Sequence, residues 1–498
     1  MADRRETGAG GGQGGEVAAP VPGDVDLAAL RCLAVLGLGR SGRPAALLAR
    51  RELPAARVVA LDEGEVPDEA RRELAAAGVE VASGEEARLP ADAGLLVKSP
   101  GVPDASPVVR AAVARGVPLW SEVEFAARFL RQRFVGITGT NGKTTTTALT
   151  GAVLEAAGLP AAVAGNIGRA LATLPGSLPD EAVVVAELSS FQLEHIVRFR
   201  PAVAVLLNLA PDHLDRHGDY RAYVTAKLRL FENQGPGDVA LLCADDEGVL
   251  AERHAGRLPG GGERGWFSAV PGRGEGPGGE PLVAGVDAEG WVWVRAGGER
   301  RRLCRRDELA LRGDHNLVNS LAAAAAACAA GADPAAAARA LRTFPGVPHR
   351  LQVVAVVDGV TYVNDSKATN VDATLKALTA YSGDVHLILG GYDKGADFRP
   401  LARATAGRVR EVLLVGATAG QLAEAFAASA ASEPATPPWE VCGDLERAVA
   451  VAARRAAPGH VVLLSPACAS WDQYRDYEER GEHFCRLVRN LASAREEE

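Results

Sequence analysis

The chain has 498 residues, which is too long for one hydrophobic core and predicts about three domains. Its formal net charge of -9 at pH 7 argues against nonspecific binding to nucleic acid or to anionic membranes, because both need a basic surface. The composition, 47% hydrophobic and 23% charged, is typical of a soluble globular protein. We therefore expect a monomeric protein with no nucleic-acid partner and no membrane partner.

The cysteines and the N-terminal segment indicate where the protein works. The seven cysteines are scattered without a C-x-x-C pair, so we expect reduced thiols and no zinc site. No apolar run reaches the length of a membrane span, and the charged, glycine-rich start lacks the apolar core of a signal peptide. These features predict a cytoplasmic protein. Residues 1–26 lack any periodicity, which predicts a flexible tail.

After this tail, short apolar runs alternate with alanine- and leucine-rich amphipathic segments, the pattern of strands and helices in a parallel α/β sheet. The pattern restarts twice, so we expect domains at 27–131, 132–346 and 347–498. The first and third are expected to be Rossmann-like, and the central one to resemble a P-loop ATPase. The expected strands are 32–36, 58–61, 95–97, 134–138, 183–186, 203–207, 239–242, 360–363, 386–389, 412–415 and 461–464. Residues 253–307 are interpreted as a hairpin-bearing excursion from the central sheet.

The first expected strand runs into the glycine-rich sequence at 37–42, Gly-Leu-Gly-Arg-Ser-Gly, and Asp62 stands twenty residues after Gly42. This is the dinucleotide-binding fingerprint. Its physical basis is a pyrophosphate at a helix N-terminus beside a ribose, which a UDP-sugar also presents. The class of nucleotide therefore stays open, and a plain tight turn is a further alternative.

A second phosphate loop occupies residues 138–145, Thr-Gly-Thr-Asn-Gly-Lys-Thr-Thr, between a strand and a helix. Backbone N–H groups of such a loop hold phosphate oxygens, Lys143 neutralises them, and the Thr144 hydroxyl can bind Mg2+. The strict Walker A spacing fails, because Ile137 stands five positions before Gly142. We expect a shortened loop that binds ATP, with a purely structural turn as the alternative.

Four further residues of the central domain carry polar groups near expected strand ends: Asn166, Glu187, His213 and Lys227. Glu187 and His213 offer oxygen and nitrogen donors for a divalent ion. Each residue also has an ordinary interpretation, as an acid near a helix N-terminus, a turn histidine or a solvated lysine. Their value as a prediction lies in their occurrence together.

Amides and an arginine follow farther along the chain. His315, Asn316 and Asn319 begin an alanine-rich helix, where the amides could contact a base or cap the helix. Arg350, after His349 at the second domain junction, can reach phosphates across a cleft or remain solvated.

Three polar loops follow expected strands in the third domain, at 364–370, 390–394 and 465–470. Any one of them could be an ordinary turn. Ligands gather at the carboxyl edge of a parallel sheet, so three such loops together predict a pocket.

Taken in this order, the motifs resemble the Mur ligase family, and the resemblance covers the chain after the tail. The motifs that carry it are residues 139–145, 187–192, 315–319, 349–350 and 364–370. Folylpolyglutamate synthetase shares the short phosphate loop and the three-domain plan, so the loop alone identifies only the superfamily. Four segments look specifically like the D-glutamate-adding branch of the family, namely 165–168, 187–194, 364–370 and 464–470.

The resemblance implies a ligase that uses ATP and Mg2+ to join D-glutamate to UDP-N-acetylmuramoyl-L-alanine through an acyl phosphate, in peptidoglycan precursor synthesis. It implies catalytic roles for Lys143, His213, Lys227 and Lys367. ATP would be bound by Gly139, Thr140, Asn141, Gly142, Lys143, Thr144, Thr145, Asn316, Asn319, Arg350 and Asp365. The UDP substrate would be bound by Leu38, Gly39, Arg40, Ser41, Gly42, Gly101 and Asn166, and D-glutamate by Thr369, Lys394, Ser470 and Tyr477. Mg2+ would be held by Thr144, Glu187, His213 and a carbamylated Lys227.

Three alternatives stay open. The first is another amino-acid ligase of the Mur or folylpolyglutamate type, which would differ in its substrates. The second is a noncatalytic nucleotide-binding protein, which would have no need for the polar residues of the second and third domains. The third is an NAD-linked dehydrogenase that uses residues 37–62. For the ligase, we expect the third domain to close over the central ATP site and exclude water.

Overall fold

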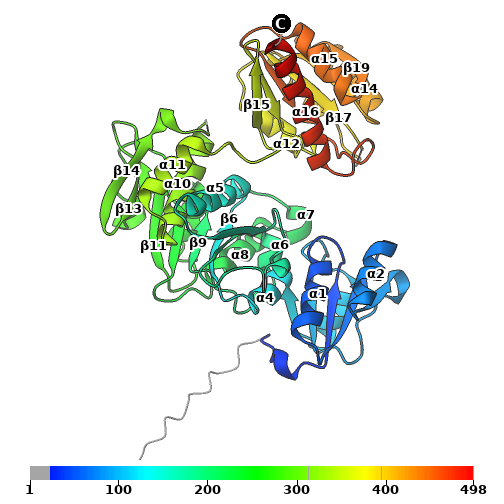
Figure 1. Cartoon of the computed structure of the whole chain (residues 1–498), viewed down its shortest axis with the longest axis vertical. Helices are drawn as coiled ribbons and strands as arrows, with labels where there is room; N and C mark the ends of the chain where they lie inside the picture. Colours follow the sequence, from blue (N-terminus) through cyan, green and yellow to red (C-terminus); the bar gives the residue numbers. More distant parts are fainter. Residues whose placement is uncertain (1–22, 312, 394, 497–498) are drawn as a thin grey trace, which may run out of the picture.

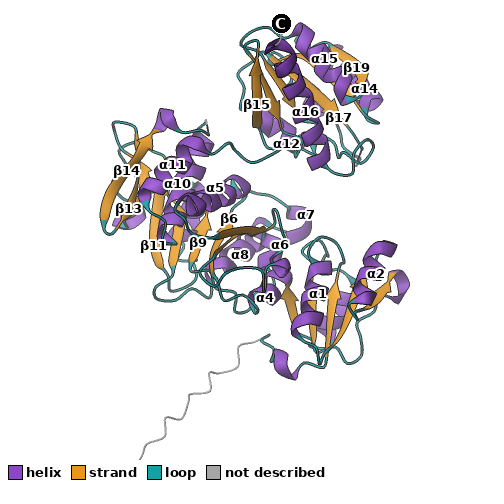
Figure 2. Cartoon of the chain, viewed as in Figure 1, coloured by secondary structure: helices purple, strands orange, loops and turns teal. Residues whose placement is uncertain are grey.

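The computed structural model describes residues 23–311, 313–393 and 395–496, which form three β-sheets flanked by helices (Figures 1 and 2). Residues 1–22 of the predicted tail lie outside the described residues. Residues 23–26 correct that prediction, because they pack against the first unit. The Trp120 indole N–H donates to the Gly23 carbonyl at 2.8 Å, and Asp24 forms an ion pair with Arg128 at 2.8 Å.

The first sheet has five parallel strands in the order β3–β2–β1–β4–β5. The order reverses at β1, so the loops that follow β1 and β4 lie side by side at the carboxyl edge, where ligands bind in such sheets. The strands are β1 (Cys32–Leu36), β2 (Arg57–Asp62), β3 (Glu80–Ser83), β4 (Leu95–Lys98) and β5 (Leu119–Ser121), and the helices are α1 (Gly42–Glu52), α2 (Asp68–Ala76), α3 (Pro107–Ala114) and α4 (Glu122–Ala127).

The second sheet has nine strands in the order β14–β13–β12–β11–β10–β9–β6–β8–β7. The region 253–307 is therefore no excursion: it extends the sheet, because the buried residues Trp266, Phe267 and Leu282 give its strands an apolar face of their own. The last two strands are antiparallel. The strands are β6 (Arg133–Thr138), β7 (Ala161–Gly165), β8 (Val183–Glu187), β9 (Val203–Leu206), β10 (Val239–Cys243), β11 (Glu263–Ser268), β12 (Leu282–Val286), β13 (Trp291–Ala296) and β14 (Glu299–Arg305).

Helices α5 and α10 cover the phosphate-loop side of this sheet (Figure 1). The run of six alanines at 322–327 is buried, and its small side chains let α10 pack closely against α5 and the strands. The helices of this part are α5 (Lys143–Ala156), α6 (Ser190–Leu193), α7 (Leu214–His217), α8 (Tyr220–Leu228), α9 (Glu247–His254), α10 (Asp314–Ala329) and α11 (Pro334–Thr343).

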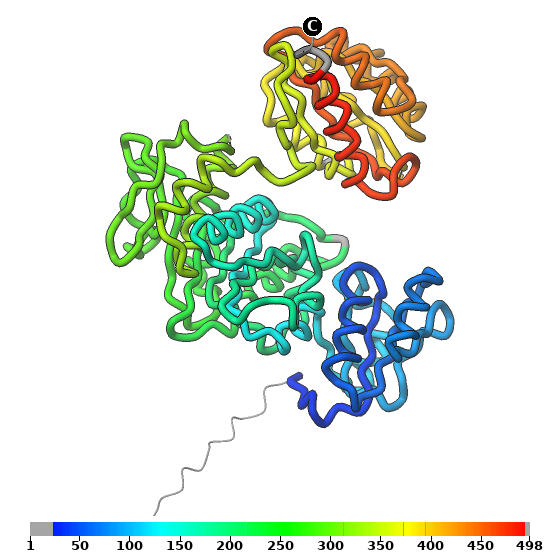
Figure 3. The backbone as a smooth tube through the Cα atoms, in the orientation of Figure 1, coloured from blue at the N-terminus to red at the C-terminus, as the bar shows by residue number. Residues whose placement is uncertain are grey.

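The third sheet has six strands in the order β15–β16–β20–β17–β18–β19, with only the β15–β16 pair antiparallel. The chain enters it once, through residues 344–351 (Figure 3). Its strands are β15 (Gln352–Val357), β16 (Val360–Asn364), β17 (Val385–Gly390), β18 (Val409–Val415), β19 (Trp439–Gly443) and β20 (Val461–Leu464), and its helices are α12 (Val371–Leu378), α13 (Arg399–Ala404), α14 (Ala419–Ala430), α15 (Leu445–Arg455) and α16 (Tyr477–Glu496). In the part of the chain that is described, no helix combines the length and the apolar character needed to cross a membrane.

Two buried glutamates of α4 join the first unit to the second. Glu124 is fully satisfied: its Oε2 accepts the backbone N–H groups of 197–199 at 2.8 to 3.0 Å, and its Oε1 accepts from Arg128 at 2.6 Å. Glu122 accepts the Ala172 N–H at 2.6 Å, but its second oxygen is buried without a hydrogen-bond partner among the described residues. Burial raises the pKa of Glu122 to about 7.

The Glu122 carboxyl predicts a stability that depends on pH. Since its pKa is higher in the folded than in the unfolded chain, the folded state binds the extra proton, and stability falls as pH rises from about 4.5 through about 7. Glu122→Gln cannot ionise and should raise the free energy of unfolding by up to about 3 kcal/mol at pH 8, and by much less at pH 5. Thermal melts at the two pH values measure this difference.

Glu124→Gln is the matched control, and it should destabilise at both pH values because it breaks an ion pair to Arg128. A gain from Glu122→Gln that is equal at pH 5 and pH 8 would contradict the buried, protonated carboxyl.

Candidate active site

The phosphate loop joins β6 to α5 and fits tightly against α10. Gly142 has φ 83°, in the left-handed region that favours glycine. A Cβ atom at this position would lie 2.3 Å from Asn319 Oδ1. The loop thus comes so close to α10 that a residue larger than glycine would clash at position 142. Asn319 therefore lies beside the loop that the sequence predicted to bind phosphate.

Two residues that the sequence reasoning missed hold this loop in shape. Asn208, just after β9, accepts the Asn141 N–H at 2.8 Å and donates to the Asn141 carbonyl at 3.1 Å. The Tyr223 hydroxyl lies 2.9 Å from Thr140 Oγ1. The position of Asn208 at the end of a buried strand, beside the loop strand, was the available signal.

Two buried lysines converge on one carbonyl of the loop. Lys143 Nζ donates to the carbonyls of Gly139 and Thr140, and Lys227 Nζ donates to the same Gly139 carbonyl, all at 2.8 Å. Burial lowers the pKa of Lys143. Burial, and then the neighbouring charge of Lys143, lower the pKa of Lys227 to about 6. Lys227 is therefore mostly a neutral amine at pH 7.

Glu187, at the end of β8, has one oxygen bound and one open. Its Oε1 accepts from Asn166 Nδ2 at 2.7 Å, whereas Oε2 is buried and lacks a hydrogen-bond partner among the described residues. A buried open carboxylate oxygen calls for a cation, and Thr144, in the first turn of α5 after β6, the strand that pairs with β8, offers a second hard oxygen donor. This donor set fits Mg2+.

His213 is the N-cap residue of α7. Its side chain is 53% exposed, its Nε2 is 3.7 Å from Asp212 Oδ2, and its ring packs on the edge of Phe191 at 5.0 Å. Across the described ranges, three ligand atoms gather within 4.8 Å only at Asp104, Glu194 and His195, where the Lys98 ammonium already binds Asp104. Neither Glu187 nor His213 belongs to a cluster of three such ligands among the described residues.

The amides of α10 bind each other and not the helix end. Asn319 Nδ2 donates to Asn316 Oδ1 at 3.2 Å, and Thr146 Oγ1 donates to Asn319 Oδ1 at 3.3 Å. The N-cap position is Gly313, without a side-chain hydrogen bond. The helix-capping alternative for these amides is wrong, and their polar edges lie beside the phosphate loop.

The third sheet contributes charges that act on the same space. Burial lowers the pKa of Lys367, although the negative charge of Glu187 partly offsets this effect. Arg350 is among the charges that lower the pKa of Lys143 and of His315. Burial raises the pKa of Asp365 to about 6, while the Ser465 hydroxyl donates to it at 2.8 Å. The described loops of the third sheet thus face the carboxyl edge of the second.

Of the residues predicted to bind D-glutamate, Lys394 lies outside the described residues. Ser470 is buried, and the Tyr477 ring lies 5.8 Å from Lys367 Nζ. Thr369 stands in the same loop as Lys367, just before α12.

In the first sheet, the glycine-rich loop is held from both sides. Leu38 N–H donates to Asp62 Oδ2 at 2.7 Å, and Ser99 Oγ donates to the Gly37 carbonyl at 2.6 Å. A Cβ at Gly42 would lie 1.8 Å from that carbonyl, so the turn requires glycine. Arg40 donates to the Gly168 carbonyl, which brings this loop to the second sheet, next to Asn166.

Arg480 on α16 joins the three loops of the third sheet, and the sequence reasoning missed it. This buried guanidinium donates to Ser366 Oγ at 3.0 Å and to the carbonyls of Ser366, Cys468 and Ala469 at 2.9 to 3.2 Å. Burial lowers its pKa to about 10, which leaves it charged at neutral pH. An Arg in a charged helix gives no sequence signal for such a role.

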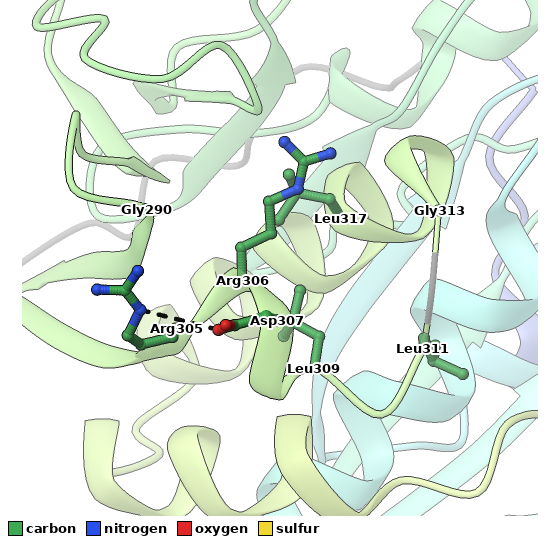
Figure 4. Close-up of a pocket in the computed structure, with 8 residues that line it drawn as sticks. All are labelled: Gly290, Arg305, Arg306, Asp307, Leu309, Leu311, Gly313 and Leu317. Carbon is green, nitrogen blue, oxygen red and sulfur yellow. Dashed lines mark ion pairs between the residues drawn. The ribbon is translucent and has the colours of Figure 1, made fainter.

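A pocket of about 400 Å³ opens at the β14 end, between the β13–β14 hairpin and the start of α10 (Figure 4). Leu309 and Leu317 form an apolar floor, and Arg305 pairs with Asp307 at its rim. Neither Asn316 nor Asn319 lines it. The pocket is thus separate from the phosphate-loop face of α10.

The fold and the site define a three-part α/β protein with a nucleoside-triphosphate loop at the centre. Residues 137–257 match the Mur ligase middle domain, and residues 349–468 match the Mur ligase glutamate ligase domain. The UDP-N-acetylmuramoylalanine–D-glutamate ligase of Pelotomaculum thermopropionicum is 43% identical over 465 residues, and that of Anaeromyxobacter dehalogenans 45% over 467, each covering 92% of this chain and 97% of the relative. The chain belongs to the Mur ligase family.

Solved structures agree on the fold. UDP-N-acetylmuramate–alanine ligase from Thermotoga maritima superposes with a TM-score of 0.53 at 19% identity, covering 93% of this chain and 99% of that one. MurF from Acinetobacter baumannii gives 0.54 at 18%, covering 88% and 91%. The expected α/β fold is confirmed.

Arg480 predicts a large loss of stability on conservative substitution. Arg480→Lys retains the charge but cannot reach all the acceptors that Arg480 holds at 366, 390 and 468–469, so buried carbonyls lose their donors. We expect the free energy of unfolding to fall by on the order of 3 kcal/mol. Arg475→Lys is the matched control, because Arg475 is exposed and pairs only with Glu479 at the surface, and it should change stability little. Equal losses for the two variants would rule out the joining role.

Proposed function

We propose that the chain is an ATP-dependent ligase that forms an amide bond between the L-alanine carboxylate of UDP-N-acetylmuramoyl-L-alanine and the amine of D-glutamate. Support comes from relatives of that name at 43% and 45% identity over nearly their whole length. The cytoplasmic, monomeric state expected from the sequence stays a prediction.

The observation that carries the proposal is the charge arrangement around Glu187. Lys143 and Lys227 from the second sheet and Lys367 from the third all lie within electrostatic reach of this one carboxylate. A protein that merely held a nucleotide would have no reason to gather three lysines, one of them fully buried, within electrostatic reach of an open carboxylate oxygen. A reaction that brings a triphosphate, a carboxylate and an amine together at one point does need such an arrangement of lysines.

A free carboxylate acylates amines poorly, so the reaction first needs a leaving group on it. The alanine carboxylate attacks the γ-phosphorus of ATP, the bond to the β,γ-bridging oxygen breaks, and an acyl phosphate and ADP form. Lys143 and Arg350 stabilise the negative charge of the transferring phosphoryl group, and the loop N–H groups position it. The D-glutamate amine then attacks the acyl carbon, loses a proton, and phosphate leaves.

Mg2+ fits the open oxygen of Glu187 and the Thr144 hydroxyl, and His213, the N-cap residue of α7, would be a further ligand. When bound, Mg2+ supplies charge neutralisation to the phosphates. The protein's own part is to hold Glu187 through Asn166 and to keep Lys227 buried and mostly neutral. We propose that Lys227 becomes a carbamate, which turns a cation into a further carboxylate-like ligand.

Carbamylation of Lys227 follows from its low pKa, because only the neutral amine attacks CO2. The nitrogen bonds to the carbon and a proton leaves, so the modification should be lost as pH falls below about 6. A carbamate signal from 13C-bicarbonate in NMR spectra should appear in the protein and vanish in Lys227→Ala. The same variant should lose roughly 100-fold or more in kcat. A signal that persists in the variant would contradict this assignment.

The alternatives are less well supported. An NAD-linked dehydrogenase needs an acid free to bind the ribose, but Asp62 is engaged by the N–H groups of Leu38 and Gly64. A folylpolyglutamate-type ligase shares the phosphate loop, but the relatives reported above carry the D-glutamate name across all three parts of the chain. The noncatalytic alternative leaves the buried lysines without a purpose.

The deciding experiment measures ATP-dependent phosphate release with UDP-N-acetylmuramoyl-L-alanine and one of four amines: D-glutamate, L-glutamate, L-lysine or meso-diaminopimelate. We expect turnover with D-glutamate alone. Lys143→Ala should abolish it, because the phosphate loop loses its cation. Turnover with a different amine would keep the ligase and overturn the substrate, and no turnover with any of them would favour the noncatalytic alternative.

A further inference from the structure

We propose that Arg216 is a positioning residue that fixes the UDP-substrate loop of the first sheet against the phosphate edge of the second. The inference rests on the proposed function, and it assigns a role to a residue that the mechanism above does not use. It is carried by hydrogen bonds, aromatic stacking and burial at the junction of the two sheets.

Arg216 reaches out of α7 in the second unit to the loop that follows β4 in the first. Its Nη1 donates to the Pro100 carbonyl at 2.7 Å, and its Nη2 donates to the Val102 carbonyl at 2.8 Å. The side chain is only 19% exposed. A planar guanidinium that binds two carbonyls two residues apart fixes both the position and the orientation of the segment between them, which is Gly101.

The other face of the guanidinium rests on an aromatic ring. Its carbon lies 4.0 Å from the centre of Phe191, in the helix α6 that follows Glu187. Phe191 also contacts the rings of His213 at 5.0 Å and His217 at 5.1 Å. Arg216 therefore packs against the segment that carries the proposed metal-binding side chains. Stacking on Phe191 and burial both stabilise this position of the guanidinium.

The loop that Arg216 holds also supports the glycine-rich turn of the first sheet. Ser99 Oγ donates to the Gly37 carbonyl at 2.6 Å, and a Cβ at Gly37 would lie 2.6 Å from a methyl group of Val102. Any shift of residues 99–102 must therefore move the turn at 37–42. A continuous set of contacts thus runs from the proposed pyrophosphate turn, through Arg216, to the edge of the phosphate-loop sheet.

Arg216 is one of several basic residues near Glu194, so neutralising that carboxylate does not account for its position. Glu194 Oε2 lies 3.9 Å from Arg216, but equally 3.9 Å from Lys98, and its Oε1 lies 3.3 Å from His217. Replacing Arg216 by Met keeps the aliphatic stem and leaves Glu194 beside two other basic groups. The substitution therefore removes the two hydrogen bonds to the loop while the junction can still fold.

The role predicts which kinetic constants change. If Arg216 fixes the UDP-substrate loop, its loss should weaken binding of that substrate, whereas ATP binds to a loop that Arg216 does not touch. A purely structural role would instead lower the melting temperature and leave all three KM values unchanged.

The test compares Arg216→Met and Arg216→Lys with Arg51→Met. Arg51 is a matched control, because it also donates from one unit to a carbonyl of the other, that of Pro175 at 2.7 Å. Its partners among the described residues, Pro175 and Glu52, do not belong to the loop at 99–102. Steady-state KM is measured for ATP, UDP-N-acetylmuramoyl-L-alanine and D-glutamate, with a melting temperature for each protein.

We expect Arg216→Met to raise KM for the UDP substrate roughly tenfold or more, because two charge-assisted hydrogen bonds to its loop are lost. KM for ATP should stay within about twofold, since no phosphate-loop contact changes. Arg216→Lys, whose ammonium keeps the charge but lacks the fork that reaches both carbonyls, should recover part of the loss, and Arg51→Met should match the unaltered protein. Equal KM values in Arg216→Met and the unaltered protein, or a parallel rise for all three substrates, would overturn the inference.

Failure of the proposed function is distinguishable from failure of this inference. If the unaltered protein does not turn over with D-glutamate, the proposed function is wrong. If it does turn over and Arg216→Met retains the same KM for the UDP substrate, the function stands and the positioning role falls.

Discussion

The central constraint on this molecule is the gathering of three lysine side chains around the buried carboxylate of Glu187. Lys143, Lys227 and Lys367 come from three distant parts of the chain, and burial lowers the pKa of each. Such an arrangement is costly in the absence of anions, and binding of an anionic ligand would make it favourable. The glycine turns, the closely packed alanine helix and the loops at the sheet edges all serve to bring these groups together.

Local patterns predicted the parts of the fold that carry strong periodicity. The apolar runs that form β1, β6 and β20 were identified within about a residue of their ends, because each is buried on both faces and bounded by glycine or polar residues. The edge strands β3 and β19 were missed, since half-exposed strands lack a continuous apolar run. The strands β11, β12 and β14 were taken for an excursion, because the segments before and between them are rich in glycine, arginine and proline.

For the site, motifs predicted which side chains act, but not what holds them. The phosphate loop was predicted from its sequence between a strand and a helix, and Glu187 from its position at the end of a strand. Asn208, Arg216 and Arg480 were not, because each acts through backbone carbonyls or amides far away in sequence, and such contacts leave no pattern in a single chain. The open oxygen of Glu187 likewise depends on where Asn166 lies, which only the fold determines.

The sequence separation between Arg480 and the loops that it holds affects the order in which the parts of the protein fold. The loops at 366 and 468–469 depend on a donor in the last helix, and the third sheet is entered only through residues 344–351. The first two sheets can fold while the ribosome is still adding the third part, since domains fold as units from the N-terminus. The loops at 366 and 468–469 can be held in place only after α16 has been made, so the first two sheets can form before these loops are fixed.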